Sequence, residues 1–215
     1  MSFDLAAFAR GCGVAGPEKF AVRCETLRQL LEEANRTTNL TRIVGETDFA
    51  VKHAADSLMI GKVFPELAGQ SLRIADVGCG AGFPSLVLAL AYPQLRITAI
   101  DSTGKKIAFV ADAAEKLGLD NLTAVHGRAN ELDRQDAFRR KFDIVTARAV
   151  APAASIVRDC RHFLAPGGRF LLYQSPDRAE TDRAEVKGMT CRITPAFDLP
   201  EDAGKRCFLE IFPGK

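Results

Sequence analysis

The fold of this 215-residue chain is indicated by the sequence Asp76-Val77-Gly78-Cys79-Gly80-Ala81-Gly82. It follows the stretch 72–77, which is typical of a short strand, and precedes the apolar stretch 84–91, which is typical of a helix. Glycines between a strand and a helix let the backbone turn tightly and let a ligand approach it closely. Asp101 ends the next predicted strand, where its carboxylate can accept hydrogen bonds from two ribose hydroxyls. This context predicts a nucleoside-binding site.

The spacing of the glycines separates two kinds of ligand. In the dinucleotide fingerprint G-x-G-x-x-G the third glycine would stand at position 83, where this chain has Phe83, whereas its third glycine is Gly82. A pyrophosphate also prefers free N–H groups at the start of the helix, and Pro84 removes one of them. S-adenosylmethionine has no phosphate and needs no such anion site. The pattern therefore favours S-adenosylmethionine, held by the three glycines and Asp101, over a dehydrogenase cofactor or a tight turn without a ligand.

Strand and helix patterns alternate from residue 71 onward. Such alternation is typical of βαβ units around a parallel sheet. We predict strands at 72–77, 96–101, 122–126, 142–146 and 169–174, and helices at 84–91, 103–117 and 153–164, the last one stopped by Pro166-Gly167-Gly168. The tail segments 190–199 and 206–212 predict an antiparallel hairpin on the sheet edge. The expected fold class is α/β, with a doubly wound, mostly parallel, Rossmann-like sheet.

The first 66 residues have a different pattern, which predicts a helical cap. Apolar residues recur at three- and four-residue steps from Glu18 to Asn35, so they share one face of a helix. The polar run 35–39 ends that helix, and a second helix begins at Thr47 or Asp48, either of which is a good N-cap. We therefore divide the chain into a cap at 1–66 and a Rossmann-like domain at 67–215.

Composition limits the class of protein. With 47% hydrophobic and 26% charged residues the chain resembles an ordinary globular protein, and it has no apolar run long enough to span a membrane. The N-terminus lacks the features of a secretory signal, so we expect a cytoplasmic protein, and we expect a monomer. Six cysteines without a C-x-x-C pair and three scattered histidines indicate no metal site. A net charge of +2 means that any nucleic-acid surface must be a local patch.

The segment after the fourth strand bears on the methyl acceptor. Methyltransferases acting on exocyclic amines usually carry an Asn/Asp-Pro-Pro-aromatic motif there, and those acting on pyrimidine carbon need a cysteine nucleophile. The segment Thr146-Ala147-Arg148-Ala149-Val150-Ala151-Pro152 has neither. It suits an acceptor that needs no activation, such as guanine N7, which carries a lone pair and loses no proton on attack. Catalysis would then consist of holding lone pair, methyl carbon and sulfur in line, and we assign no catalytic residue.

A few polar side chains are candidates for binding the substrate. Arg148 ends a buried-type strand beside the predicted cleft, where it needs a carboxylate, the cofactor or a substrate phosphate as partner. His53 and Asp56 are three residues apart on the second helix and can share a face, which suits a site or a surface hydrogen bond equally. Lys105 follows the ribose-binding carboxylate and is a candidate RNA ligand. Two aspartates dilute the basic cluster 134–141, and we interpret it as solvated surface.

Several segments between about residues 35 and 174 match a known family. They are Asn39-Leu40-Thr41, Lys52-His53-Ala54-Ala55-Asp56-Ser57-Leu58, the glycine turn with Phe83-Pro84, Asp101-Ser102 with Lys105-Lys106, Gly127-Arg128-Ala129, and Phe142-Asp143-Ile144-Val145-Thr146-Ala147-Arg148-Ala149. On these segments the chain resembles the glucose-inhibited division protein B family, bacterial methyltransferases acting on guanine N7 in 16S ribosomal RNA. The resemblance implies a class I S-adenosylmethionine-dependent methyltransferase fold with a helical cap. It also implies a site role for His53 and Asp56, and cofactor contacts at Gly78, Phe83, Ala129, Asn130 and Arg148.

Two positions depart from the family pattern. The family usually has an acidic residue where this chain has Asn130, and Lys-Gly where it has Gln174-Ser175. Our leading hypothesis is N7 methylation of one guanine in 16S ribosomal RNA, with that RNA or the small ribosomal subunit as partner. The departures and the near-neutral charge leave two alternatives, which are a methyltransferase for a small molecule or protein and a cofactor-binding regulator without turnover.

Overall fold

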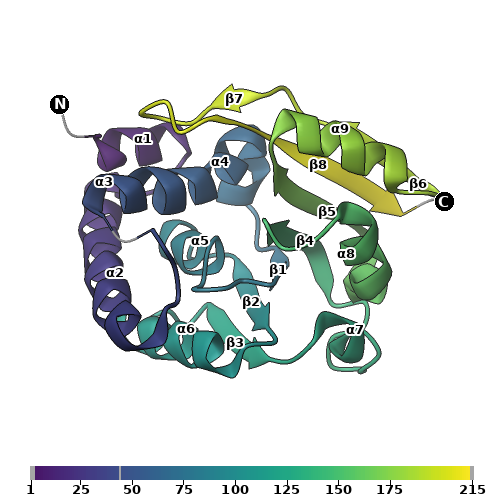
Figure 1. The fold of residues 1–215 in the computed structure, drawn as a ribbon, viewed down its shortest axis with the longest axis horizontal. Coiled ribbons are helices and arrows are strands. Elements are labelled where there is room, and N and C mark those ends of the chain that lie inside the picture. The colour runs from purple at the N-terminus through teal and green to yellow at the C-terminus, as the bar shows by residue number, and fades with distance from the viewer. Residues whose placement is uncertain (1–2, 44, 214–215) are drawn as a thin grey trace.

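One sheet with helices on both faces organises the computed structural model, which describes residues 3–43 and 45–213 (Figure 1). The strand order is β3-β2-β1-β4-β5-β8-β6, and β7 pairs with β8. The parallel strands are β1 (Arg73–Val77), β2 (Arg96–Asp101), β3 (Leu122–His126), β4 (Phe142–Arg148) and β5 (Leu164–Gln174). The chain winds outward from β1 through β2 to β3, and then from β4 to β5 on the other side. This is the predicted doubly wound sheet, and the α/β class is confirmed.

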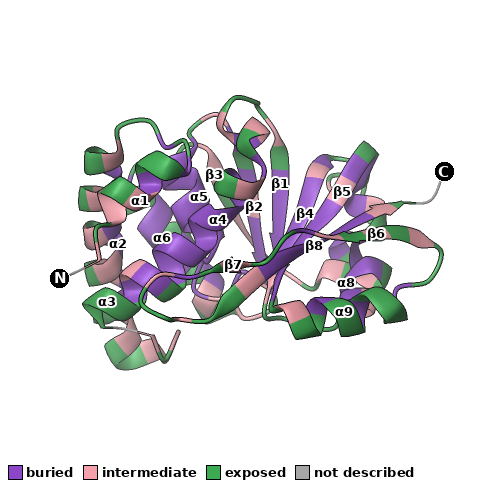
Figure 2. Cartoon of the chain, turned by 90° about the horizontal axis from the view of Figure 1, so that it is seen from above, coloured by how far each residue is buried: buried purple, intermediate pink, exposed green. Residues whose placement is uncertain are grey.

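Two apolar layers cover the two faces of the sheet. One buried cluster includes the N-terminal helices together with α5 (Ser85–Ala91) and α6 (Gly104–Lys116). The other includes α7 (Ala129–Leu132), α8 (Ala153–Cys160) and α9 (Pro176–Glu185). The central strands between them are buried along most of their length (Figure 2). A sheet covered on both faces needs apolar side chains at successive positions, which explains the apolar strands 72–77 and 142–146.

The C-terminal strands are antiparallel, as the sequence predicts. They are β6 (Met189–Ile193), β7 (Phe197–Asp198) and β8 (Lys205–Pro213). The last strand, β8, lies between β5 and β6, so that β6 forms the edge of the sheet. The predicted strand 190–199 is interrupted, because Pro195 has no N–H to donate. Thr194 pairs with β8 through its own backbone N–H and through its hydroxyl, which accepts from the Phe208 N–H at 2.9 Å.

The N-terminal region is helical, as predicted. Its elements are α1 (Leu5–Gly11), α2 (Pro17–Thr38), α3 (Glu46–Asp48), the π-helical turn η1 (Phe49–Ala55), α4 (Asp56–Val63) and the 3-10 turn η2 (Pro65–Ala68). The polar run 35–39 ends α2, as predicted, because the helix stops at Thr38 and Asn39 caps it in a left-handed conformation. The Asn35 amide bonds to the backbone of Thr41 beyond the helix end. The second helix begins at Glu46, so a start at Thr47 or Asp48 is wrong. The Asp48 carboxylate pairs with Lys52 Nζ at 2.7 Å and caps no backbone N–H.

Two further elements differ from the prediction. The helix α8 ends at Cys160, a 3-10 turn η3 (Arg161–Phe163) follows, and β5 already begins at Leu164. Pro166-Gly167-Gly168 therefore lies within an irregular part of β5, where the register against β4 shifts, and does not end the helix. The helix α9 has no predicted counterpart, because only Ala179 and Asp182 of its ten residues are buried and its sequence shows little apolar periodicity.

The cap and the sheet domain share a core. Leu27 and Leu31 of α2 belong to the same buried cluster as Leu86 of α5 and Val110 of α6. The division at residue 66 stays a prediction, and the outermost residues of the two predicted domains, 1–2 and 214–215, lie outside the described residues.

Gly61 allows α4 to approach the end of α5 closely. An added Cβ would lie 1.9 Å from the hydroxyl of buried Tyr92, which donates to the Cys12 carbonyl at 2.7 Å. Helix propensity alone would make Gly61→Ala stabilising, but this overlap should lower the free energy of unfolding by about 1–3 kcal/mol. Urea unfolding measures the change. The control is Gly11→Ala, whose Cβ meets nothing within 4 Å; an equal loss in both variants would contradict the packing argument.

Candidate functional site

A cleft of about 1510 Å³ opens at the carboxyl ends of the parallel strands. The loops after β1 and β4 leave the sheet in opposite directions there, which is where doubly wound sheets bind ligands. The cap closes one side of the cleft through Leu40, Thr41 and His53, and the start of α9 with β8 closes the other. Pockets for one small ligand measure about 300–1,000 Å³. This cleft therefore has room for a nucleoside ligand and part of a second molecule.

The glycine turn forms the floor of the cleft. The Gly78 and Cys79 N–H groups donate to the Ile100 carbonyl at 2.8 and 3.0 Å, which holds the turn against the end of β2. Gly80 has a φ of 59°, and a Cβ built on it would meet nothing within 4 Å, so its backbone faces open space. Gly82 differs, because it packs under the turn against Leu86 and does not line the cleft.

Asp101 holds the turn and still faces the cleft. One carboxylate oxygen accepts from the Gly80 N–H at 2.9 Å and the other from the Thr103 N–H at 2.8 Å. A carboxylate offers about four lone-pair sites. Each oxygen therefore keeps capacity for one more donor, which suits a pair of ribose hydroxyls.

Asp76 has a structural position below the cleft. It is 1% exposed, and one of its oxygens accepts from the N–H and hydroxyl of Ser85, at the start of α5. Burial raises the pKa of Asp76 to about 6. The carboxylate joins the end of β1 to the following helix and so fixes both ends of the glycine turn.

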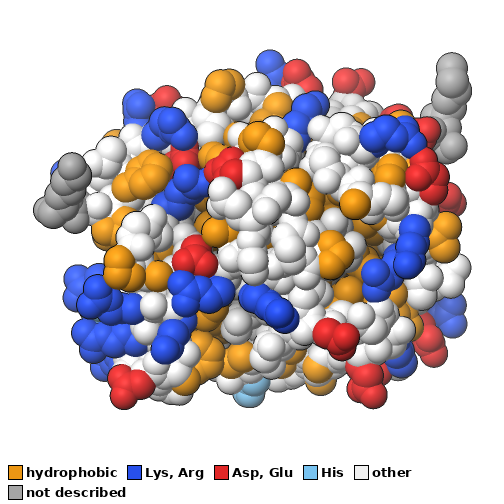
Figure 3. Space-filling view, turned by 180° about the vertical axis from the view of Figure 1, so that it is seen from behind, with side chains coloured by type: hydrophobic (Ala, Val, Ile, Leu, Met, Phe, Trp, Pro, Cys, Tyr) orange, Lys and Arg blue, Asp and Glu red, His pale blue; other side chains and the backbone are white. Residues whose placement is uncertain are grey.

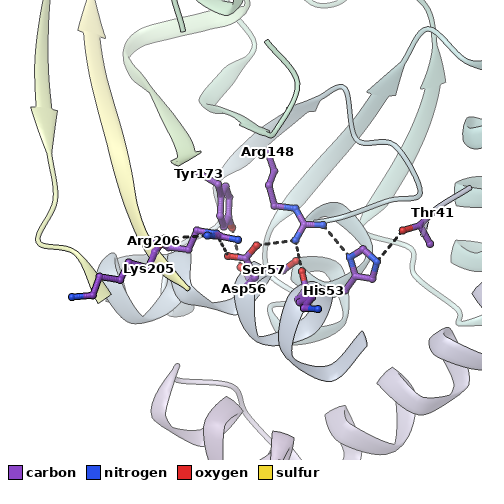
Figure 4. Close-up of polar contacts among 9 residues, drawn as sticks. Thr41, His53, Asp56, Ser57, Arg148, Tyr173, Lys205 and Arg206 are labelled. Atoms are coloured by element: carbon purple, nitrogen blue, oxygen red, sulfur yellow. Dashed lines mark hydrogen bonds and ion pairs between the residues drawn. The ribbon is translucent and has the colours of Figure 1, made fainter. Parts of the chain in front are cut away.

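Arg148 links the end of β4 to the cap. Figure 4 shows its guanidinium pointing at the helical segment that carries His53 and Asp56. Nη1 donates to the Lys52 carbonyl at 2.8 Å and to Asp56 Oδ2 at 3.0 Å, and Nη2 lies 3.1 Å from His53 Nδ1. Of the partners that the sequence analysis considered for Arg148, the structure shows a carboxylate, and an imidazole lies beside it.

His53 is neutral and has a defined tautomer. Burial and the neighbouring Arg148 guanidinium lower the pKa of His53 to about 3. Because a guanidinium can only donate, Nδ1 must accept, and Nε2 carries the proton toward the Thr41 hydroxyl at 3.4 Å. The ring also stacks on Phe83, with centroids 4.0 Å apart. The predicted site residues His53, Phe83 and Arg148 therefore form one unit.

Asp56 is the second anchor of this unit. Its side chain is 4% exposed and lies between two arginines, with Arg206 Nε 3.5 Å from Oδ1 (Figure 4). The neighbouring Tyr173 hydroxyl donates to the Ser57 carbonyl at 2.8 Å, and burial raises the pKa of Tyr173 well above its ordinary value. The β5 and β8 strands are thereby tied to the same helical segment.

The cleft is more basic than the chain as a whole. Its lining includes the carboxylates Asp56, Asp101 and Asp159 against six cations, which are Lys52, Lys106, Arg128, Arg148, Arg178 and Arg206. Sequence reasoning named neither Arg178 nor Arg206 as a site residue. Arg178 stands near the N-terminus of α9, the helix that follows the fifth strand. Its position at the cleft could have been predicted only if that helix had been predicted. Nothing in the local sequence distinguishes Arg206 from a surface arginine.

The remaining predicted site residues fall in two groups. Ala129 and Asn130 begin α7 and line the cleft near Asp101 and Gly127. Lys105 does not line it, because its Nζ donates to the Thr38 carbonyl at the end of α2 at 2.9 Å, whereas Lys106 does. The substrate contact assigned to Lys105 stays a prediction.

Two absences concern the described residues alone. Within residues 3–43 and 45–213, no group of three or more His, Cys, Asp and Glu side chains is placed to hold a metal ion. In the same part of the chain, none of the helices is both long enough and apolar enough to cross a membrane.

Solved structures that align with this chain include S-adenosylmethionine-dependent methyltransferases. A precorrin-6y C5,15-methyltransferase from Geobacter metallireducens aligns with a TM-score of 0.57 at 17% identity, covering 81% of this chain and 92% of that one. Fibrillarin from Aeropyrum pernix, solved with natively bound S-adenosyl-L-methionine, aligns with a TM-score of 0.52 at 16% identity over 66% of each chain. At these identities the likeness establishes the class I methyltransferase fold.

Sequence comparison is more specific. The family model described as rRNA small subunit methyltransferase G matches residues 22–197. Proteins named ribosomal RNA small subunit methyltransferase G are 43% identical in Limosilactobacillus reuteri, over 85% of this chain and 78% of the relative, and 39% identical in Staphylococcus epidermidis, over 85% and 77%. The chain therefore belongs to the rRNA small subunit methyltransferase G family, the family that its motifs resemble.

Proposed function

We propose that this protein transfers a methyl group from S-adenosylmethionine to N7 of one guanine in 16S ribosomal RNA. The choice of N7 rests on one observation, which is that the carboxylates and the imidazole of the cleft are already paired. Asp101 is held by two backbone N–H groups, Asp56 by Arg148 and Arg206, and Asp159 by Arg158. The His53 lone pair faces Arg148. Among the described residues, the cleft thus offers no free general base, and N7 attack needs none.

The cleft fits S-adenosylmethionine. Asp101 has acceptor capacity for the two ribose hydroxyls, and the open space over Gly80 admits a ligand against the backbone. We assign the purine base to the Ala129-Asn130 backbone at the start of α7, which lines the same cleft. When bound, S-adenosylmethionine supplies an electrophilic methyl group on a sulfonium. The chain's contribution is then to hold the donor and to align the acceptor with it.

The acceptor guanine would enter from the side formed by β4, β5, α9 and β8. Arg178 and Arg206 line this side, and guanidinium groups bind phosphates and stack on bases. Arg148, His53 and Asp56 then act as a positioning unit that fixes the cap relative to both ligands. Six cations in the cleft favour an RNA substrate over an uncharged small molecule. We place this activity in the cytoplasm, because its proposed substrate is ribosomal RNA, and the expectation of a monomer stays a prediction.

The direct test is methyl transfer to ribosomal RNA. Purified protein, labelled S-adenosylmethionine and 16S RNA or small subunits from cells lacking the gene should yield one 7-methylguanine, located by nuclease mapping and mass spectrometry. RNA that already carries the modification serves as the control and should accept nothing. Transfer to another atom would overturn the N7 assignment, and tight cofactor binding with no turnover would favour a regulator.

Asp101 supplies a second test. Asp101→Asn removes the charge from hydrogen bonds worth about 1.5–3 kcal/mol each, so S-adenosylmethionine should bind on the order of 10- to 100-fold more weakly. Titration calorimetry measures the Kd, and urea unfolding checks that the variant is folded. The matched control is Asp159→Asn, a cleft carboxylate on α8 that we do not assign to the donor. Equal affinity of Asp101→Asn and the wild type for S-adenosylmethionine would show that Asp101 does not bind the donor.

A further inference from the structure

A second basic surface lies at the opposite end of the sheet from the cleft. We call it the distal patch and define it by Arg134, Arg139, Arg140, Lys141 and Arg161, all exposed. Lys141 directly precedes β4 and Arg148 ends it, seven strand residues later. At about 3.3 Å per residue, the patch and the cleft are on the order of 20 Å apart. Figure 3 shows Lys and Arg side chains gathered at the lower left of the rear view, behind the position of α7 in Figure 1.

Backbone pairing brings the two segments of the patch together. The Arg140 N–H donates to the His162 carbonyl at 2.6 Å, and the Lys141 N–H donates to the Phe163 carbonyl at 3.0 Å. Arg140 has a φ of 55°, a left-handed conformation uncommon for residues other than glycine, which this pairing holds in place. The side chains of Arg139, Arg140 and Lys141 are therefore presented from an ordered segment beside Arg161.

The acidic residues near the patch do not neutralise it. Asp133, one of the two aspartates that dilute this cluster in the sequence, is 4% exposed, and its carboxylate accepts from His162 Nδ1 at 2.7 Å. Asp143 is occupied by Arg73, which it binds through both oxygens. Asp136 and Glu131 are exposed, which leaves two carboxylates against five cations. None of the five cations forms an ion pair with any other residue that the structure describes. The interpretation as diluted, solvated surface therefore loses its main support.

From this geometry we infer that the distal patch binds the phosphate backbone of 16S ribosomal RNA, away from the guanine in the cleft. Unpaired, exposed cations in an ordered segment are suited to phosphates, which they bind without reading sequence. A chain with a net charge of only +2 has little long-range attraction for RNA, so local patches must supply it. Two basic surfaces about 20 Å apart require an RNA substrate that is folded or long enough to reach both. This inference rests on the proposed function.

The test is a triple variant, Arg139→Gln, Arg140→Asn and Lys141→Gln, in which asparagine suits the left-handed position. Binding to protein-free 16S RNA is measured at several salt concentrations, together with kcat and KM for methyl transfer. Loss of three phosphate contacts should reduce the slope of log K against log salt by about 2. The KM should rise on the order of tenfold, while kcat and the Kd for S-adenosylmethionine stay unchanged.

The matched control removes three other exposed cations, as Lys19→Gln, Lys62→Gln and Lys187→Gln, and so changes the net charge equally. An unchanged salt slope in the distal-patch variant, or an equal loss in the control, would overturn the inference. So would an effect seen with small subunits but absent with protein-free RNA, because the patch would then contact a protein. Failure of the proposed function is distinguishable, since the wild type would then produce no 7-methylguanine while its salt slope could still be measured.

Discussion

Arg148 is the side chain on which the arrangement of the cleft depends. A guanidinium at the end of a central strand is costly to bury unless it is paired, and its partners all come from one helical segment of the cap. The wide π-helical turn at Phe49–Ala55 brings the Lys52 carbonyl, His53 and Asp56 to the same guanidinium. Within residues 3–43 and 45–213, removing Arg148 would leave buried Asp56 with Arg206 at 3.5 Å as its one charged partner. The cap is therefore held over the cleft by electrostatics as well as by the shared apolar core.

The same contacts determine which chemistry the cleft can perform. Pairing with Arg148 and Arg206 occupies Asp56, and burial beside Arg148 lowers the pKa of His53 to about 3 and keeps it neutral. The donor side is specified by backbone geometry at Gly78 and Gly80 and by one carboxylate, whereas the acceptor side is lined by arginines. Such a cleft can hold and align two partners, but none of its described residues is free to remove a proton. An acceptor with a neutral lone pair can react in such a cleft, because it loses no proton when it attacks the methyl group.

Much of the fold and of the donor side of the cleft could be predicted from the sequence, because both depend on local sequence patterns. The strand-glycine-helix sequence 72–91 and the acid at 101 define the donor side in one βαβ unit, and the alternation of elements predicts the doubly wound parallel sheet. The polar unit of His53, Asp56 and Arg148 joins residues more than ninety positions apart, so periodicity alone could not connect them. Lys105 and Lys106 adjoin in sequence, but only Lys106 lines the cleft, since helix geometry turns neighbouring side chains apart. The burial of Asp133 could not be predicted from the sequence either, because it depends on a contact with His162 from another element.

We infer that methyl transfer in this cleft needs alignment and no general base. The single-turnover rate of methyl transfer to 16S RNA, measured with saturating S-adenosylmethionine from about pH 7 to about pH 9, tests it most directly. This range lies above the pKa of about 3 for His53 and of about 6 for Asp76. The rate should stay constant within about twofold across the range. A rate that rises about tenfold for each pH unit would show that a proton must be lost before the methyl group moves, and would rule out transfer without a general base.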